Sequence, residues 1–195
     1  MAKRPSKRTL PAPLAEALKD LVFWLETEQV SQVIVGGVAV ALIARPRVTQ
    51  DIDAVIWVDT GLLDSFIKSG ERFRITPRID DIVEFARLNR VLLLQHEATG
   101  IGIDLSCGAL PFESEMIDRA IELTVKSLKI RVATPEDLIV MKALPRRNRD
   151  IADIEAIIDI NPNLDYERIR YWVREFAIAL EMPEILTDLE KMLPH

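Results

Sequence analysis

The 195-residue sequence contains a single cysteine, Cys107, and no long hydrophobic run. One cysteine can form neither a disulfide framework nor a cysteine-based zinc cluster, so we expect Cys107 to be a small buried apolar residue in the reducing cytoplasm. A membrane-spanning helix needs about 20 apolar residues, and no segment approaches that length. The N-terminus also lacks the apolar segment of a signal peptide. We therefore expect a cytoplasmic protein with no membrane partner.

Internal repeats and low-complexity segments are also absent, which excludes repeat architectures. Hydrophobic residues make up 49% of the chain and charged residues 29%, a composition typical of a globular protein. A chain of this length buries roughly 70% of its unfolded surface, so its core requires no structural metal. The formal net charge of −6 argues only weakly against a nucleic-acid partner, because a basic cleft can lie on an acidic protein.

The spacing of apolar residues divides the chain into three predicted parts. These are a flexible basic tail over residues 1–10, a mixed α/β core over 11–133 and an all-helical region over 134–195. In the core we expect helices over 11–28, 38–44, 62–68, 79–88 and 114–121, and strands over 33–35, 53–58, 91–95, 101–105 and 128–132. In the C-terminal region we expect helices over 134–144, 150–158, 165–180 and 183–192.

Turn and cap residues mark several of these boundaries. Gly100 ends a four-residue turn between two predicted strands, as a hairpin requires. Thr134 followed by Pro135 is typical of a helix start, with Thr134 as the cap. Asp165 is expected to cap the helix that follows it.

Two aspartates, Asp51 and Asp53, stand at the start of a predicted buried strand. Because strand side chains alternate between faces, both carboxylates are expected on one face and Ile52 on the other. Two carboxylates held this close repel each other, and a bound divalent cation removes that repulsion. Oxygen ligands suit Mg²⁺ or Mn²⁺.

Asp104 is the candidate for a third carboxylate. It lies in the segment I-G-I-D-L-S, where apolar residues share one face and Asp104 lies on the other. If this strand is adjacent to that of Asp53, three carboxylates meet at one sheet edge. Such a set binds two metals about 4 Å apart, which assist phosphoryl or nucleotidyl transfer.

The pair Gly36-Gly37 lies between a predicted strand and a predicted helix. Glycine allows close approach of a phosphate to the backbone, and the amides of a helix N-terminus attract an anion. No Gly-Lys-Ser/Thr follows, so the segment is not a P-loop.

Together, V-I-V-G-G, R-V-T-Q-D-I-D and the later I-D resemble the DNA polymerase β nucleotidyltransferase superfamily. Within it, the chain is similar to minimal bacterial nucleotidyltransferases of the AbiEii toxin type. The resemblance covers about residues 33–153 and includes the segment K-A-L-P-R-R-N-R-D-I-A-D. It implies an α+β fold with a nucleotidyltransferase-like mixed β-sheet, flanked by helices and followed by a helical C-terminal part.

The resemblance also implies roles for individual residues. The metal ligands would be Asp51, Asp53 and Asp104, with Asp104 also activating the attacking hydroxyl. Lys142 would be a catalytic residue that meets phosphate charge, and Asp150 and Asp153 would orient Lys142 or the nucleotide. The nucleotide-binding residues would be Gly36, Gly37, Arg47, Thr49, Lys142 and Asp150. One departure concerns Gly37: the superfamily commonly has serine there, and its hydroxyl contact to phosphate is missing.

The strand-side residues also have simpler interpretations. Asp51 and Asp53 could be solvated acids at a strand end. Asp104 could cap a turn or pair with an arginine. Arg47 and Thr49 could bond backbone or carboxylate groups within their own loop.

The helix-side residues have alternatives as well. Lys142 could be solvent-exposed beside the core face of its helix. Asp150 and Asp153 lie three apart and could form local ion pairs with Arg146 or Arg149. The cluster Arg146, Arg147 and Arg149 could contact phosphate or nucleic acid, or could belong to a solvated basic loop.

The sequence thus predicts a metal-dependent enzyme that transfers a nucleoside monophosphate from a nucleoside triphosphate such as ATP to an acceptor hydroxyl. The acceptor could be a tRNA end, a protein or a small molecule, and a toxin-like role would require an antitoxin partner. The alternative is a non-catalytic module that binds a nucleotide or a protein partner on the same fold. A metal-dependent phosphodiesterase with water as nucleophile is a third hypothesis.

Overall fold

The computed structural model describes residues 10–194; residues 1–9 of the expected basic tail lie outside this range. A seven-stranded mixed sheet, in the order β3-β4-β5-β2-β1-β7-β6, forms its centre. The strands are β1 (Ser31–Val35), β2 (Asp51–Trp57), β3 (Ile75–Pro77), β4 (Val91–His96), β5 (Ile101–Cys107), β6 (Ile121–Val125) and β7 (Leu128–Val132).

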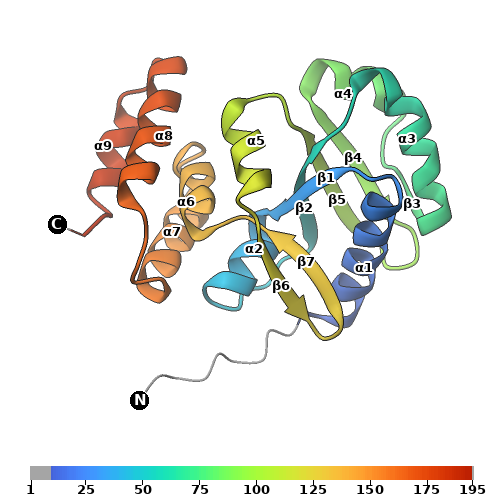
Figure 1. Ribbon diagram of the computed structural model, residues 1–195, viewed down its shortest axis with the longest axis horizontal. Helices are drawn as coiled ribbons and strands as arrows, with labels where there is room; N and C mark the ends of the chain where they lie inside the picture. The colour runs from blue at the N-terminus through green and yellow to red at the C-terminus, as the bar shows by residue number, and fades with distance from the viewer. Residues whose placement is uncertain (1–9, 195) are drawn as a thin grey trace.

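Helices flank this sheet and form the C-terminal part of the chain. Those before the last strand are α1 (Ala12–Thr27), α2 (Gly36–Ile43), α3 (Leu63–Gly70), α4 (Ile82–Asn89) and α5 (Pro111–Asp118), with short 3₁₀ turns η1 (Thr60–Leu62) and η2 (Glu71–Phe73). Those after it are α6 (Pro135–Ala143), α7 (Asn148–Ile160), α8 (Tyr166–Ala179) and α9 (Glu184–Glu190). In Figure 1, α6–α9 stack together at one end of the sheet, beside α2 and α5. The predicted fold class is confirmed.

The three central strands set the geometry of the candidate site. β1 pairs with β2 antiparallel, whereas β2 and β5 run parallel with Asp51 opposite Gly102 and Asp53 opposite Asp104. β4 and β5 form the predicted antiparallel hairpin, and Gly100 has the positive φ of 69° that favours glycine in its turn. The condition stated from the sequence, that the strand of Asp104 is adjacent to the strand of Asp53, is therefore met.

The core consists of aliphatic side chains packed between the sheet and its helices. On α1, Leu14, Leu18 and Leu21 are almost completely buried against the sheet. In β2, Ile52 and Ala54 are equally buried, so this strand is anchored on the face opposite Asp51 and Asp53. Burial of each such aliphatic side chain stabilises the fold by about 1.5–3 kcal/mol, which holds the aspartate-bearing strand in place.

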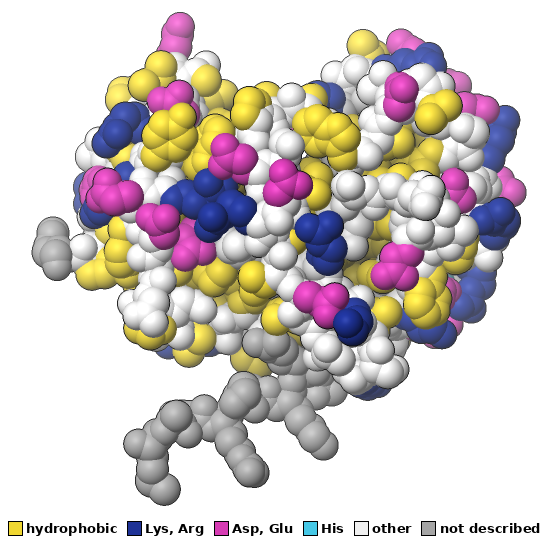
Figure 2. All heavy atoms as spheres, in the orientation of Figure 1, with side chains coloured by type: hydrophobic (Ala, Val, Ile, Leu, Met, Phe, Trp, Pro, Cys, Tyr) yellow, Lys and Arg dark blue, Asp and Glu magenta, His cyan; other side chains and the backbone are white. Residues whose placement is uncertain are grey.

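Ion pairs also join the C-terminal helices to the rest of the molecule. Arg168 on α8 donates to Asp137 on α6 at 3.0 Å and to Glu115 on α5 at 2.7 Å. The predicted caps are confirmed, since Thr134 accepts from the Asp137 N–H and Asp165 from the Arg168 N–H. On the face shown in Figure 2, acidic and basic side chains lie next to one another over these helices.

Two strands were not predicted, and two helices were placed wrongly. The helix expected over 79–88 begins only at Ile82, after the three-residue strand β3. The helix expected over 114–121 begins at Pro111 and ends at Asp118, because Ile121 starts β6. The alternating pattern I-E-L-T-V of β6 is typical of a strand but was assigned in part to the preceding helix, whereas β3 is too short to show any periodicity. Within residues 10–194, no helix is long and apolar enough to span a membrane. Cys107 is buried, as expected.

Candidate active site

A cleft of about 380 Å³ lies between the edge of the sheet and helices α6 and α7. Every nucleotide-binding, metal-binding or catalytic residue predicted from the sequence lines it, except Thr49, which lies next to it. The lining residues are Val35, Gly36, Gly37, Arg47, Asp51, Asp53, Asp104, Ser106, Leu138, Met141, Lys142, Pro145, Arg147, Arg149 and Asp150. The fold thus brings together residues that are up to 115 positions apart, with β2 and β5 as one wall and α6–α7 as the other.

The strand wall concentrates negative charge around Asp53. Burial raises the pKa of this carboxyl, and the neighbouring charges of Asp51 and Asp104 raise it further. A backbone hydrogen bond from Gly37 and the more distant charge of Lys142 act in the opposite direction without restoring the ordinary pKa. The protein alone therefore does not neutralise the charge at this position.

Gly36 fixes the approach of α2 to Asp53. Its φ is 61°, and a Cβ atom at this position would collide with the Asp53 carboxylate. Any other residue would both strain the backbone and displace Asp53. The first glycine of the pair is therefore required by the packing of the β1–α2 turn against β2.

Gly37 has a different reason to lack a side chain. A Cβ atom there would lie 2.5 Å from Thr49 Oγ1 and 2.6 Å from Arg47 Nη2. Thr49 in turn donates a hydrogen bond to Asp51 Oδ1 at 3.0 Å. The space that a serine side chain would enter is thus already filled by a hydroxyl and a guanidinium from the R-V-T segment.

Asp104 pairs with Arg78, a residue that the sequence did not single out. Arg78 is thus the arginine partner that the sequence allows as the alternative role of Asp104. Burial raises the pKa of Asp104, the Arg78 charge opposes that shift, and Asp51 adds to it. Arg78 is 26 positions away from Asp104, and no sequence pattern connects them.

Among residues 10–194, no group of three histidine, cysteine or acidic side chains adopts a metal-holding arrangement.

The helix wall is charged but internally paired. Lys142 is only 8% exposed, so the solvent-exposed alternative was wrong. Its Nζ lies 3.1 Å from Asp150 Oδ1 and 3.2 Å from Asp153 Oδ2. Arg47 Nε lies 3.4 Å from Asp153 Oδ1, and Arg147 Nε donates to Asp150 Oδ2 at 2.6 Å. These acids therefore orient cations of the cleft.

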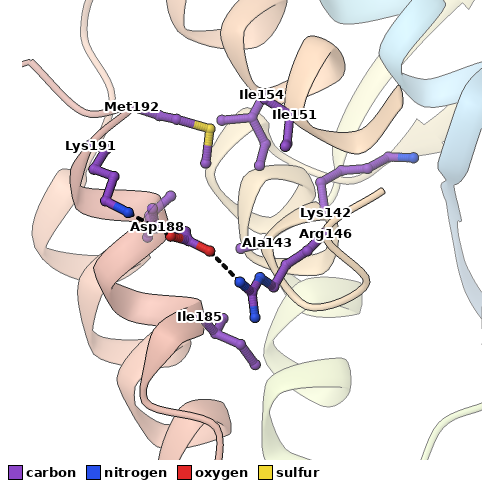
Figure 3. Close-up of a pocket in the computed structure, with 10 residues that line it drawn as sticks. Lys142, Ala143, Arg146, Ile151, Ile154, Ile185, Asp188, Lys191 and Met192 are labelled. Carbon is purple, nitrogen blue, oxygen red and sulfur yellow. Dashed lines mark hydrogen bonds and ion pairs between the residues drawn. The ribbon is translucent and has the colours of Figure 1, made fainter. Parts of the chain in front are cut away.

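The local ion pairs expected for Asp150 and Asp153 with Arg146 or Arg149 do not form. Arg146, with a positive φ of 55°, turns to the other side of the α6–α7 connection, where it pairs with Glu184 and Asp188 of α9. It lines a second cavity there, of about 380 Å³. The stem of Lys142 also borders this cavity, but Figure 3 shows its ammonium group directed away from it. Lys142 thus presents its charge only to the cleft.

Comparison with known proteins identifies a family. Residues 14–184 match the family described as "Nucleotidyltransferase of unknown function (DUF6036)". No curated protein matches the chain.

Several solved structures share the fold. An antigenic nucleotidyltransferase-like protein from Paracoccidioides brasiliensis is 16% identical, with 91% of this chain and 94% of that chain covered and a TM-score of 0.55. The antibiotic-resistance factor ANT(2'')-Ia is 13% identical, with 90% and 97% covered and a TM-score of 0.61. The lincosamide antibiotic adenylyltransferase LnuA, solved with lincomycin bound, is 18% identical, with 75% and 97% covered and a TM-score of 0.55. At these identities the likeness establishes the architecture alone.

Proposed function

This chain belongs to the DUF6036 family of nucleotidyltransferases of unknown function, and from that premise we propose that it transfers a nucleoside monophosphate from a nucleoside triphosphate to an acceptor hydroxyl. The observation that carries the proposal is the Asp51–Asp53 pair, which β2 places beside Asp104 and opposite a wall of cations. The proposed enzyme depends on Mg²⁺ or Mn²⁺.

The Asp51–Asp53 pair fits a divalent cation in its donor chemistry. Both carboxylates line the cleft, and the raised pKa of Asp53 reflects burial together with acidic neighbours. Carboxylate oxygens are preferred ligands of Mg²⁺ and Mn²⁺. When bound, such an ion stabilises negative charge on the phosphoryl group being transferred. Asp51 and Asp53 would hold it between the sheet edge and the triphosphate.

The triphosphate would lie between the β1–α2 turn and α6. The Gly37 N–H already bonds Asp53, and the neighbouring amides at the N-terminus of α2, which no side chain at Gly36 or Gly37 covers, would attract the anion. Arg47, which with Thr49 fills the space beside Gly37, would supply positive charge, and Thr49 would supply a hydroxyl once its proton turns from Asp51 Oδ1 to the phosphate. Lys142 would add a third contact, oriented by Asp150 and Asp153.

Asp104 is the proposed proton acceptor. In the transfer, the acceptor oxygen forms a bond to the α-phosphorus, the bond from that phosphorus to the bridging oxygen breaks, and pyrophosphate leaves. The proton of the attacking hydroxyl passes to Asp104, whose raised pKa makes it a stronger base than an ordinary aspartate. Arg78 contacts Oδ1 of this carboxylate, which leaves Oδ2 for the proton.

The acceptor is the open choice in this proposal. Two of the structures with this fold were solved with an antibiotic or its adenylylated form: LnuA with lincomycin, and ANT(2'')-Ia with adenylyl-2''-tobramycin. They support a small hydroxyl-bearing molecule. The resemblance to AbiEii-like toxins supports instead a tRNA end or a protein acceptor, together with a neutralising antitoxin.

One experiment separates these acceptors. The purified protein is incubated with each α-³²P-labelled nucleoside triphosphate, Mg²⁺ or Mn²⁺, and cell extract divided into RNA, protein and small-molecule fractions. We expect label in one fraction, lost with EDTA and with the double variant Asp51→Asn/Asp53→Asn. Transfer by the double variant at the native rate would disprove the proposal.

A non-catalytic nucleotide-binding module is the second candidate, favoured by the pairing of Asp104 with Arg78. Calorimetry with each triphosphate and Mg²⁺ tests it. Binding without pyrophosphate release in any of the three fractions would support the module over the enzyme.

A further inference from the structure

We propose that Arg78 takes the place of one of the two cations expected for this type of site, so that the cleft binds a single divalent cation at Asp51 and Asp53. This inference rests on the proposed function. It concerns how many metal ions the site holds rather than whether the protein transfers nucleotides.

The backbone fixes Arg78 at the edge of the cleft. Its N–H donates to the Leu93 carbonyl at 2.9 Å, which extends the β3–β4 pairing by one residue beyond Pro77. β4 lies between the Arg78 backbone, which follows β3, and Asp104 on β5. The Arg78 side chain therefore reaches Asp104 across β4. The backbone position of Arg78 is thus set by three paired strands.

Gly102 leaves the space in which this guanidinium lies. A Cβ atom on Gly102 would be 3.2 Å from Arg78 Nη1 and 4.0 Å from the Cβ of Asp51. Gly102 is the direct neighbour of Asp51 on the adjacent strand, just as Asp104 is the neighbour of Asp53. The guanidinium therefore lies against β5 at Gly102, in contact with Asp104 two residues further along the same strand.

The charges of the strand wall then divide into two groups. Asp104 has a fixed cation, Arg78, whereas the Asp51–Asp53 pair has none in direct ion-pair contact among the residues that the structure describes. A second metal ion at Asp104 would have only Oδ2 as a ligand, because Arg78 occupies Oδ1, and the guanidinium would repel that ion at short range. One metal ion plus Arg78 supplies positive charge to all three carboxylates without that conflict.

The test counts metal ions directly. The full chain is saturated with a non-hydrolysable ATP analogue and titrated with Mn²⁺, and bound Mn²⁺ per chain is measured by electron paramagnetic resonance. We expect one ion for the native protein, two for Arg78→Gln, and one for Arg78→Lys, which keeps the charge. Arg72→Gln, which removes an exposed arginine paired with Glu28, serves as the matched control and should bind one.

Two further variants assign the ions. The double variant Arg78→Gln/Asp104→Asn should return the count from two to one, because the second ion requires Asp104. Asp104→Asn alone should keep one ion with an affinity within threefold of native, and this variant remains informative if Arg78→Gln does not fold. A native count of two, a count that stays at one in folded Arg78→Gln, or loss of the ion in Asp104→Asn would overturn the inference and leave the proposed function standing. Failure of the native protein to bind any Mn²⁺ would instead contradict its proposed metal dependence.

Discussion

The two walls of the cleft handle charge in opposite ways. On the strand wall, Asp51 and Asp53 face the cleft without a direct cationic partner among residues 10–194, and the pKa of Asp53 is raised. On the helix wall, Asp150 is completely buried, and its pKa is lowered. Burial alone would raise it, but hydrogen bonds from Arg147 and Lys142 outweigh that effect. The negative charge of the Asp51–Asp53 pair on the strand wall is thus not compensated by an ion pair among the described residues, whereas Asp150 on the helix wall is paired with Lys142 and Arg147.

Because of this difference, we expect the aspartates of the two walls to have different roles. An aspartate that is destabilised by its surroundings gains most from an added ligand, whereas an aspartate already paired contributes to the folded state itself. Removal of a strand-wall carboxylate should therefore affect chemistry, and removal of a helix-wall carboxylate should affect stability. The predictions below test that division, from the largest expected effect to the smallest.

Asp53→Asn should reduce nucleotidyl transfer by about a thousandfold, because a bound metal contributes several kcal/mol to stabilisation of the transition state. The rate of pyrophosphate release measures this, and the free energy of unfolding in EDTA should not fall, since the substitution removes repulsion from Asp51 and Asp104. The control is Asp64→Asn, an exposed residue paired with Lys68 on α3. If Asp53→Asn unfolds the protein instead, the strand wall is structural and the comparison fails.

Asp150→Asn should lower the free energy of unfolding by about 3 kcal/mol, because it breaks a buried ion pair and leaves Lys142 and Arg147 under-compensated. Urea denaturation measures the loss. On the same helix, Asp159→Asn removes an exposed pair with Arg45 and should cost less than about 1 kcal/mol. Equal losses for the two variants would show that burial of the helix-wall network contributes nothing.

Gly37→Ser should weaken triphosphate binding by about tenfold instead of strengthening it, since a side chain there overlaps Thr49 and Arg47 and such overpacking costs about 1–3 kcal/mol. Calorimetry with the non-hydrolysable ATP analogue gives the affinity, and Gly61→Ser on an exposed turn is the matched control. Tighter binding by Gly37→Ser would mean that the R-V-T segment does not replace the serine.

The strand wall could be predicted from the sequence much better than the helix wall. Alternation along β2 and β5 places Asp51, Asp53 and Asp104 on one face, and the parallel pairing confirms their adjacency. Periodicity is local, so it finds side chains that share a strand. Asp150 and Asp153 were predicted as partners of Lys142 only through the family resemblance, because their contact depends on how α6 meets α7, which no local pattern records.

Arg78, on the strand wall, shows the same limit of prediction from local sequence patterns. It reaches Asp104 only because β3 adds to the far edge of β4, and β3 is a three-residue strand without a sequence signature. Gly102 gave no signal either, because a glycine in a strand has many explanations. The site residues that sequence analysis missed are those whose position depends on sheet order.

The smallest expected effect is a difference in the pH dependence of stability between the walls, measured in EDTA. An acid whose pKa is raised on folding holds its proton longer in the folded state, so stability relative to Asp53→Asn should fall as the pH rises from the ordinary aspartate pKa of about 3.9 through the raised folded value. For Asp150 the folded pKa is lowered, so its contribution relative to Asp150→Asn is present above about 3.9 and is lost as the pH falls through the folded value. Urea denaturation from pH 3 to pH 7 should therefore show opposite signs for the change of stability with pH at Asp53 and at Asp150. In a second series, with Mg²⁺ in place of EDTA, only the slope for Asp53 should flatten, because only the strand wall has charge left for a cation to neutralise.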